Sequence, residues 1–521
     1  MIPRAWRWFP VPALIAVLTW GMFLSDRSPG TTAARDGLPL DDAWIHLVYA
    51  RSLIAEGGFN YNRGVPETGM TSPLWVVLAA PVHALASPAG KEATVLAIKL
   101  LSLLCGFAGL AALYALVLAI GEGALIAAIA ASIAALDPSL TFTRAAGMEM
   151  PLFSCLLLAA LALAVNGRTL GASAAAGLAV TARPEGLVAL PFVILLLIRA
   201  ERRRTVVRPA RALAALALMA LPAALYAAFC LFATGVPLPN TFYAKFSSEN
   251  SFSAAALAFG WTHYIEGNLP YFTAGIGAWL ALLGATRFVR RRPLEGFAIL
   301  GAGFVLFAGT LMTRHFPAGH FHYWERWLVP VFPILILAMT LGLAELRDGF
   351  ASLRRAEGDR RGAAIAPSRP RWAATLAILA AALLLWALPG AQRERAAHYA
   401  WNCQNIEEMN VAAGRWLGAT LAPDAVVAVI DAGAIRYFGE RHTLDLMGLN
   451  EHRLLRGDPS AAMRPLRESS EPRAVLFPTP GRELILRYGL EPVRVFAASR
   501  YTITDGPQDS LVVYRWPQES P

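Results

Sequence analysis

Two neighbouring carboxylates, Asp41 and Asp42, are the first side chains in this sequence that could do chemistry. They open the stretch DDAWIHLVYARSL, whose pattern predicts an amphipathic helix. Neighbouring like charges raise the pKa of one carboxyl group, which brings that group closer to the strength of a general base. The simpler interpretation is helix capping, because an aspartate at a helix start accepts backbone N–H bonds. Capping explains one aspartate more easily than two.

The rest of the chain is mostly apolar. Of its 521 residues, 56% are hydrophobic and 16% are charged, and the mean hydropathy is +0.47. Soluble domains carry about 25% charged residues, and several uncharged runs here are long enough to cross a bilayer. The sequence therefore predicts a polytopic α-helical membrane protein. About eleven spans are expected, at residues 9–25, 94–119, 123–140, 150–166, 169–182, 185–199, 211–234, 270–287, 295–313, 327–346 and 372–389.

The net charge of +10 comes largely from arginines in short loops, at 199–211, 287–292 and 354–371. This is the positive-inside distribution of a bacterial inner-membrane protein, and it argues against a nucleic-acid-binding patch. The short apolar segment 73–87 decides the topology, because its crossing would move all three loops to the outer side. We therefore expect this segment to lie in the membrane interface and the first span to be an uncleaved signal anchor.

This topology places the loop 26–93, with both aspartates, and the tail 390–521 on the outer, periplasmic side. The runs AVVAVI, AVLFP and LVVYR in the tail are typical of strands, and helical stretches separate them. The sequence thus predicts a transmembrane domain, residues 1–389, followed by a soluble α/β domain. A single cysteine falls in the tail, and no Cys/His spacing typical of a metal site is present.

Six stretches together resemble the GT-C membrane glycosyltransferases, in particular the mycobacterial terminal arabinofuranosyltransferases and their bacterial relatives. They are DDAWIHLVYARSLIAEGGFNYNRGVPETGMTSPLW, GMEMPLF, TARPEG, PNTFYAK, ERWLVPVFP and DAGAIRYFGERHTLDLMGLN. The resemblance runs from residue 41 to about residue 450, and it is the combination that is specific. The chain departs from the family just before Arg326, where relatives often carry Gly-Gly-Asp and this sequence has PAGHFHYWE.

The resemblance implies an enzyme with a polyprenyl-phosphate sugar as donor and a glycan, lipid or protein as acceptor. The sugar implied is arabinofuranose, transferred usually with inversion. The leaving phosphate needs cations; arginine binds two phosphate oxygens and lysine acts as a point charge. The candidate phosphate-binding residues are Lys245, Arg326, Arg183, Arg144 and Arg314. The alternative for each is a cation that reaches from the bilayer to the interface.

The acceptor hydroxyl must lose a proton. We expect Asp41 to be the base and Asp42 to be its partner, or the reverse. Glu149 could bind substrate or form a structural ion pair with Arg144, and Asp431 is expected to cap a helix. No cofactor is expected, although a divalent cation at the aspartate pair is an alternative. The substrate-binding candidates are Glu149, Tyr243, Asn240, His322 and Trp75.

Two other functions stay open from the sequence. One is a transporter or flippase of lipid-linked sugars, and the other is a GT-C enzyme that transfers a hexose or an aminosugar. Transporters place ionisable residues near the middle of the membrane and often contain inverted repeats. Here the acidic pair lies in a loop, and no repeat is evident.

The predicted topology can be tested by cysteine labelling. A cysteine introduced near residue 250 should react with a membrane-impermeant thiol reagent in intact spheroplasts, and one near residue 358 should react only after lysis. Labelling of the second position in intact spheroplasts would mean that residues 73–87 cross the membrane.

Overall fold

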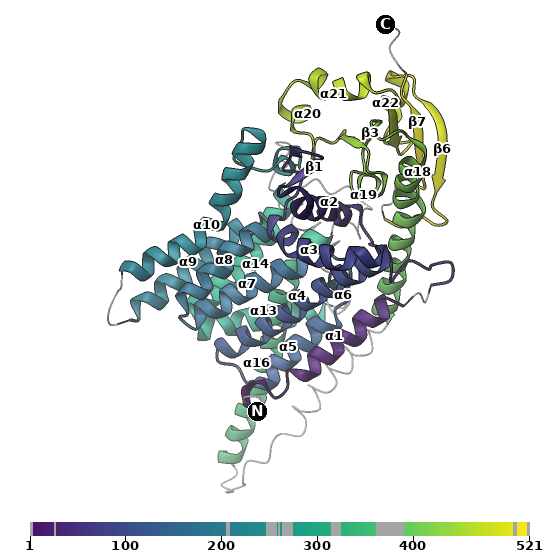
Figure 1. Ribbon diagram of the computed structural model, residues 1–521. Helices are drawn as coiled ribbons and strands as arrows, with labels where there is room; N and C mark the ends of the chain where they lie inside the picture. The colour runs from purple at the N-terminus through teal and green to yellow at the C-terminus, as the bar shows by residue number, and fades with distance from the viewer. Residues whose placement is uncertain are drawn as a thin grey trace.

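The computed structural model describes residues 4–25, 28–204, 209–245, 258, 261–262, 275–313, 325–360, 390–503 and 508–517. A bundle of helices forms the body of the molecule, and a smaller α/β domain lies at one end of the bundle (Figure 1). The segment between α1 and α4, which contains α2 and α3, lies where the two parts meet (Figure 1).

The eleven helices of the bundle named here coincide with ten of the predicted spans, because the span predicted at 123–140 takes in one helix and the start of the next. They are α1 (Pro10–Phe23), α4 (Lys91–Ala119), α5 (Ala124–Leu136), α6 (Pro138–Ala145), α7 (Met150–Val165), α8 (Thr169–Ala182), α9 (Gly186–Arg202), α10 (Pro209–Thr234), α13 (Ile276–Arg291), α14 (Pro293–Thr313) and α16 (Phe332–Arg360). Large apolar side chains such as Leu104 and Phe232 are more than half exposed. Apolar surface on this scale marks a face that meets lipid.

By length and composition, four described helices can cross a membrane, namely Lys91–Ala119, Pro209–Thr234, Pro293–Leu311 and Val329–Gly349. The pair α5 and α6, bent by 65°, would make a fifth. The expected span 372–389 lies outside the described residues. A polytopic helical protein is therefore confirmed, and the count of eleven stays a prediction.

The loop predicted at residues 26–93 contains the predicted helix, α2 (Asp41–Glu56). This helix ends where Gly57 adopts a left-handed conformation with φ of 70°, as glycine does at many helix ends. A short hairpin, β1 (Asn60–Asn62) with β2 (Val65–Pro66), leads to α3 (Pro73–Ala86). At 14 residues α3 is shorter than a typical span, so its interfacial position stays a prediction.

The tail forms the predicted α/β domain around a five-stranded sheet of order β4-β3-β5-β7-β6. Strand β3 (Val426–Val429) pairs in parallel with β4 (His442–Asp445) and β5 (Arg473–Leu476), while β7 (Ser510–Arg515) is antiparallel to β5 and to β6 (Glu491–Ala497). The three runs predicted as strands form β3, β5 and β7. The helices of the domain include α18 (Ala412–Thr420), α19 (Ala434–Gly439), α20 (His452–Arg456), α21 (Pro459–Glu468) and α22 (Arg482–Arg487).

The first turn of α2 binds the tail directly. The carboxylate of Asp41 accepts hydrogen bonds from the backbone N–H of Gly433 at 2.7 Å and of Ala434 at 2.8 Å, at the start of α19. A Cβ at position 433 would lie 2.1 Å from the backbone oxygen of Asp41, so the approach requires glycine. The hydroxyl of Tyr61 adds a bond to the carbonyl of Ala432 at 2.7 Å.

Candidate functional site

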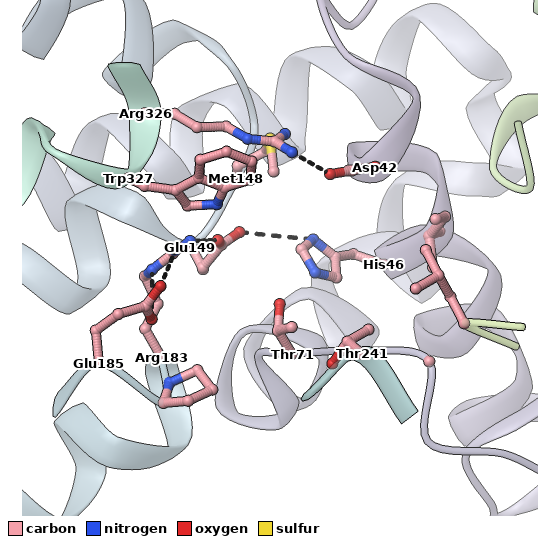
Figure 2. Close-up of a pocket in the computed structure, with 14 residues that line it drawn as sticks. Asp42, His46, Thr71, Met148, Glu149, Arg183, Glu185, Thr241, Arg326 and Trp327 are labelled. Carbon is pink, nitrogen blue, oxygen red and sulfur yellow. Dashed lines mark hydrogen bonds and ion pairs between the residues drawn. The ribbon is translucent and has the colours of Figure 1, made fainter. Parts of the chain in front are cut away.

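A cavity of about 520 Å³ lies between α2, the turns that precede α7 and α9, and the short helix η4 (Glu325–Trp327) (Figure 2). The residues that line it are Asp42, Ile45, His46, Gly69, Thr71, Met148, Glu149, Arg183, Pro184, Glu185, Thr241, Arg326, Trp327 and Leu449. Polar and charged side chains from the outer loop, the bundle and the segment before α16 therefore converge on one space.

The structure separates the two neighbouring aspartates. Asp42 lines the cavity, and its carboxylate accepts a bond from Nη2 of Arg326 at 2.6 Å (Figure 2). Asp41 is not among the lining residues, because its oxygens bind the tail. Successive residues of an α-helix point about 100° apart, so the two carboxylates of one turn serve different neighbours.

The second arginine of the cavity, Arg183, binds two carboxylates. Its Nη1 donates to Oε1 of Glu149 at 2.5 Å, and its Nη2 and Nε donate to the two oxygens of Glu185 at 2.8 and 3.2 Å. All three groups are largely buried, with Arg183 only 4% exposed. Buried ions need such pairing, because the charged forms lose their water.

Two local features of the sequence place these groups in the cavity. Arg183 precedes Pro184, and a residue before proline avoids the helical region; Arg183 accordingly ends α8 in an extended conformation. Gly147 has a φ of 68°, which glycine adopts without strain, and it turns the chain between α6 and α7. Glu149 follows two residues later and faces the cavity (Figure 2).

His46 joins the site from the same face of α2 as Asp42, four residues later. Its Nδ1 lies 3.8 Å from Oε2 of Glu149. Among the described residues both atoms are buried and neither makes a hydrogen bond. Burial lowers the pKa of His46 below its usual 6.5, and the nearby carboxylate of Glu149 opposes this only in part. The imidazole is therefore neutral at pH 7, able to accept a proton at one nitrogen and to donate from the other.

Four of the predicted site residues thus come together: Asp42, Glu149, Arg183 and Arg326. Arg144 does not join them. Its guanidinium donates to the carbonyls of Ala134 and Ala135 and to the hydroxyl of Thr141, which satisfies the end of α5. The alternative ion pair between Glu149 and Arg144 is wrong, because Glu149 pairs with Arg183.

The PNTFYAK stretch binds the tail more than it lines the cavity. Asn240 donates to Glu67 at 2.7 Å and accepts from Arg456 of α20 at 2.8 Å. The guanidinium of Arg456 also lies 4.1 Å from the centre of the Tyr243 ring, a cation–π contact. Among the described side chains of α11 (Asn240–Lys245), Thr241 lines the cavity. Asn240 and Tyr243 instead contact the tail, and their role in substrate binding stays a prediction.

The remaining predicted residues lie elsewhere. Trp75 is fully buried in the core and does not line the cavity. Arg314, His322 and the side chain of Lys245 lie outside the described residues.

Asp431 does not cap α19 as predicted. Asp41 supplies the oxygen atoms for that helix start, and Asp431 accepts a bond from Nδ2 of Asn410 at 2.8 Å. Burial raises the pKa of Asp431 to about 6. Burial also raises the pKa of Asp41, and the charge of Asp431 adds to this effect. The junction therefore holds two carboxyl groups that are both hard to ionise.

One group of described side chains has the spacing of metal ligands, namely Glu67, Glu451 and His452. It lies outside the cavity, and protein groups already occupy it: His452 binds Glu67 at 2.7 Å, and Arg453 binds both oxygens of Glu451. Within the cavity, the lining carboxylates are those of Asp42, Glu149 and Glu185.

Sequence reasoning missed His46 and Glu185. His46 carried a usable signal, since it lies one helical turn after Asp42 on the same predicted helix face. Glu185 lies inside the TARPEG motif, but its pairing with Arg183 depends on the conformation of the turn.

The fold is similar to that of solved membrane enzymes. ArnT from Cupriavidus metallidurans in the apo state matches with a TM-score of 0.58 at 15% identity, over 97% of each chain. The same protein bound to undecaprenyl phosphate matches with a TM-score of 0.59 at 14% identity, over 98% of each chain. AglB from Archaeoglobus fulgidus, in complex with an inhibitory peptide and a dolichol-phosphate, matches with a TM-score of 0.57 at 13% identity, over 97% of this chain and 75% of that chain.

These similarities confirm the predicted fold, a GT-C-like helical membrane protein with a C-terminal α/β domain. In sequence, residues 401–512 match a family model described as Domain of unknown function (DUF8728). No curated protein sequence matches the chain.

The buried carboxyl group of Asp431 predicts a pH-dependent stability. Because its folded-state pKa of about 6 exceeds the unfolded value of 3.8, Asp431 costs no stability below about pH 4, and the cost grows as the pH rises from there to about 6. Asp431→Asn should therefore raise the unfolding free energy at pH 7.5 by about 1–3 kcal/mol and change it little at about pH 3.5. Thermal unfolding at both pH values measures this effect.

Asp424→Asn, at an exposed position of the same domain, is the control and should change neither value. A lower melting temperature of Asp431→Asn at pH 7.5 would show that the charged form of Asp431 holds the junction together.

Proposed function

We propose that this protein is a glycosyltransferase that moves a sugar from a polyprenyl-phosphate donor to an acceptor at the outer face of the bacterial cytoplasmic membrane. The observation that carries the proposal is the cavity lined by Arg183, Arg326 and Asp42, in which the guanidinium of Arg326 forms an ion pair with the carboxylate of Asp42. The similarity of fold to ArnT bound to undecaprenyl phosphate and to AglB with dolichol-phosphate supports this class of donor.

The two arginines are suited to hold the donor phosphate. Arg326 comes from η4 and Arg183 from the turn before α9, so they approach the cavity from different elements. A phosphate that enters would replace Asp42 as the partner of Arg326, since a phosphate binds the guanidinium fork with two oxygens. The same cations would stabilise the charge that develops as the sugar–phosphate bond breaks.

Asp42 is then the residue we assign as the base. Once the phosphate binds Arg326, the carboxylate of Asp42 can accept the proton of the acceptor hydroxyl. The hydroxyl oxygen attacks the anomeric carbon from the side opposite the phosphate, which leaves with the bonding electrons, and the configuration inverts. This assignment reverses the order that we expected from the sequence, because Asp41 is engaged by Gly433 and Ala434.

His46 and Glu149 are proposed to hold the sugar. The neutral imidazole can donate to or accept from a sugar hydroxyl, and the nearby hydroxyl groups of Thr71 and Thr241 can do the same. No cofactor is assigned to this mechanism.

Arabinofuranose is the sugar that we favour, on the sequence resemblance to the terminal arabinofuranosyltransferases. A hexose or an aminosugar is the alternative within the same enzyme class. A flippase for lipid-linked sugars would use the cavity without breaking the sugar–phosphate bond. A panel of labelled polyprenyl-phosphate sugars, incubated with the purified protein and with membranes as acceptor, separates these functions through the release of free polyprenyl phosphate.

Replacement of Asp42 tests the assigned base. Asp42→Asn keeps the size of the side chain and removes its basicity, so sugar transfer per folded molecule should fall by about 10²-fold or more. The melting temperature should also fall, because the buried guanidinium of Arg326 loses the charge of its partner. Release of labelled polyprenyl phosphate from the preferred donor measures the rate.

Asp41→Asn is the matched comparison, since it alters the neighbouring carboxyl group outside the cavity. We expect it to affect the melting temperature more than the transfer rate per folded molecule. The reverse pattern, with transfer abolished by Asp41→Asn and retained by Asp42→Asn, would refute the assignment. Recovery of Asp42→Asn by excess divalent cation would indicate a metal site instead of a base.

A further inference from the structure

A second charged cavity lies at the other end of α9. It has a volume of about 670 Å³ and is formed by the end of α7, the turn after it, the end of α9 and the start of α14. Its charged lining residues are Arg199, Arg203, Arg204 and Glu295. Helix α9 has 17 residues and is therefore about 25 Å long, so it separates this cavity from the one beside Arg183. The end of α9 that carries the arginines points away from the tail domain (Figure 1).

The contacts of these arginines fix the shape of the cavity. Arg199 forms an ion pair with the buried carboxylate of Glu295, and Nη1 of Arg292 lies 3.7 Å from the same carboxylate. Arg204 donates to the carbonyl of Gly167 at 2.7 Å, which attaches the end of α9 to the turn after α7. Arg203, next to it in the chain, is exposed and lines the cavity.

Positive charge exceeds negative charge around this cavity. Glu295 faces the two guanidinium groups of Arg199 and Arg292, and Glu201 lies 3.2 Å from Arg204. Arg199 is close enough to Arg203 and Arg292 to be repelled by both. Four guanidinium groups thus share two carboxylates, and an anion in the cavity would relieve the repulsion between them.

Exposed apolar side chains lie close in the sequence to residues that line the cavity. Each of three adjoining helices carries a large exposed apolar residue within four positions of a lining residue: Leu170 of α8, Ile198 of α9 and Phe297 of α14, with exposed fractions of 41%, 47% and 60%. An anion with attached hydrocarbon chains would place the anion among the arginines and its chains along these faces. A water-soluble anion would leave the apolar faces unused.

We propose that this cavity binds the phosphate headgroup of an anionic membrane phospholipid, in the leaflet opposite the glycosyl-transfer site. Basic cavities between membrane helices are suited to such headgroups, because the headgroup charge is held at a fixed depth beside the acyl chains. The phosphate binds Arg203 together with Arg199 and Arg204, and the acyl chains lie against Ile198 and Phe297. This site is independent of the transfer reaction.

The test compares two neighbouring arginines. Arg203 lines the cavity, whereas Arg202 is exposed and does not line it, so Arg203→Gln and Arg202→Gln each remove one charge from the same turn. Binding of phosphatidylglycerol to the purified protein in detergent is measured by native mass spectrometry, with phosphatidylcholine of the same acyl chains as the neutral lipid. Arg203→Gln should weaken phosphatidylglycerol binding about tenfold, and Arg202→Gln should change it less than twofold.

Several outcomes would overturn the proposal. Equal losses in the two variants would mean diffuse attraction to surface charge. Binding of phosphatidylcholine as tight as that of phosphatidylglycerol would mean that the headgroup charge does not contribute to binding. Competition by soluble glycerol phosphate at the concentration of the lipid would identify a site for free phosphate. Arg203→Lys, which keeps the charge, should lose less than Arg203→Gln, and all variants should melt at the wild-type temperature without added lipid.

Discussion

The carboxylate of Asp41 determines how the two parts of the molecule meet. It accepts both N–H groups at the start of α19, and the glycine at position 433 allows the backbones to approach. Since neighbouring residues of a helix point about 100° apart, fixing Asp41 toward the tail turns Asp42 toward the bundle. The depth and orientation of the cavity at Asp42 therefore depend on the contact between Asp41 and the start of α19, which lies outside the cavity.

The charge balance of the cavity follows from this placement. Two guanidinium groups, of Arg183 and Arg326, face the carboxylates of Asp42, Glu149 and Glu185. Every one of these charges would be costly to bury alone, so each is paired while the cavity holds no donor. A phosphate that binds the arginines changes the partners without leaving a cation unpaired, and it releases a carboxylate at the place where a base is needed. In the proposed mechanism, one ion pair thus links binding of the donor to activation of the base.

Much of the fold could be predicted from the sequence because the helices and strands depend on local residue patterns. The apolar runs predicted the bundle helices, and AVVAVI, AVLFP and LVVYR predicted three strands of the tail. Motifs also pointed to Asp42, Glu149, Arg183 and Arg326, which the fold brings together. The division of work between Asp41 and Asp42 could not be predicted, since it depends on a contact with Gly433, 392 positions away. The contacts of Asn240 and Tyr243 with Arg456 in the tail could not be predicted for the same reason.

The affinity for undecaprenyl phosphate, measured for the wild type and for Asp42→Asn, tests most directly whether the ion pair of Asp42 with Arg326 is the place of the donor phosphate. We predict that Asp42→Asn binds undecaprenyl phosphate at least as tightly as the wild type, because Arg326 has lost a competing carboxylate. Arg326→Gln should bind it about tenfold to a hundredfold more weakly. Weaker binding by Asp42→Asn, or unchanged binding by Arg326→Gln, would contradict this role of the pair.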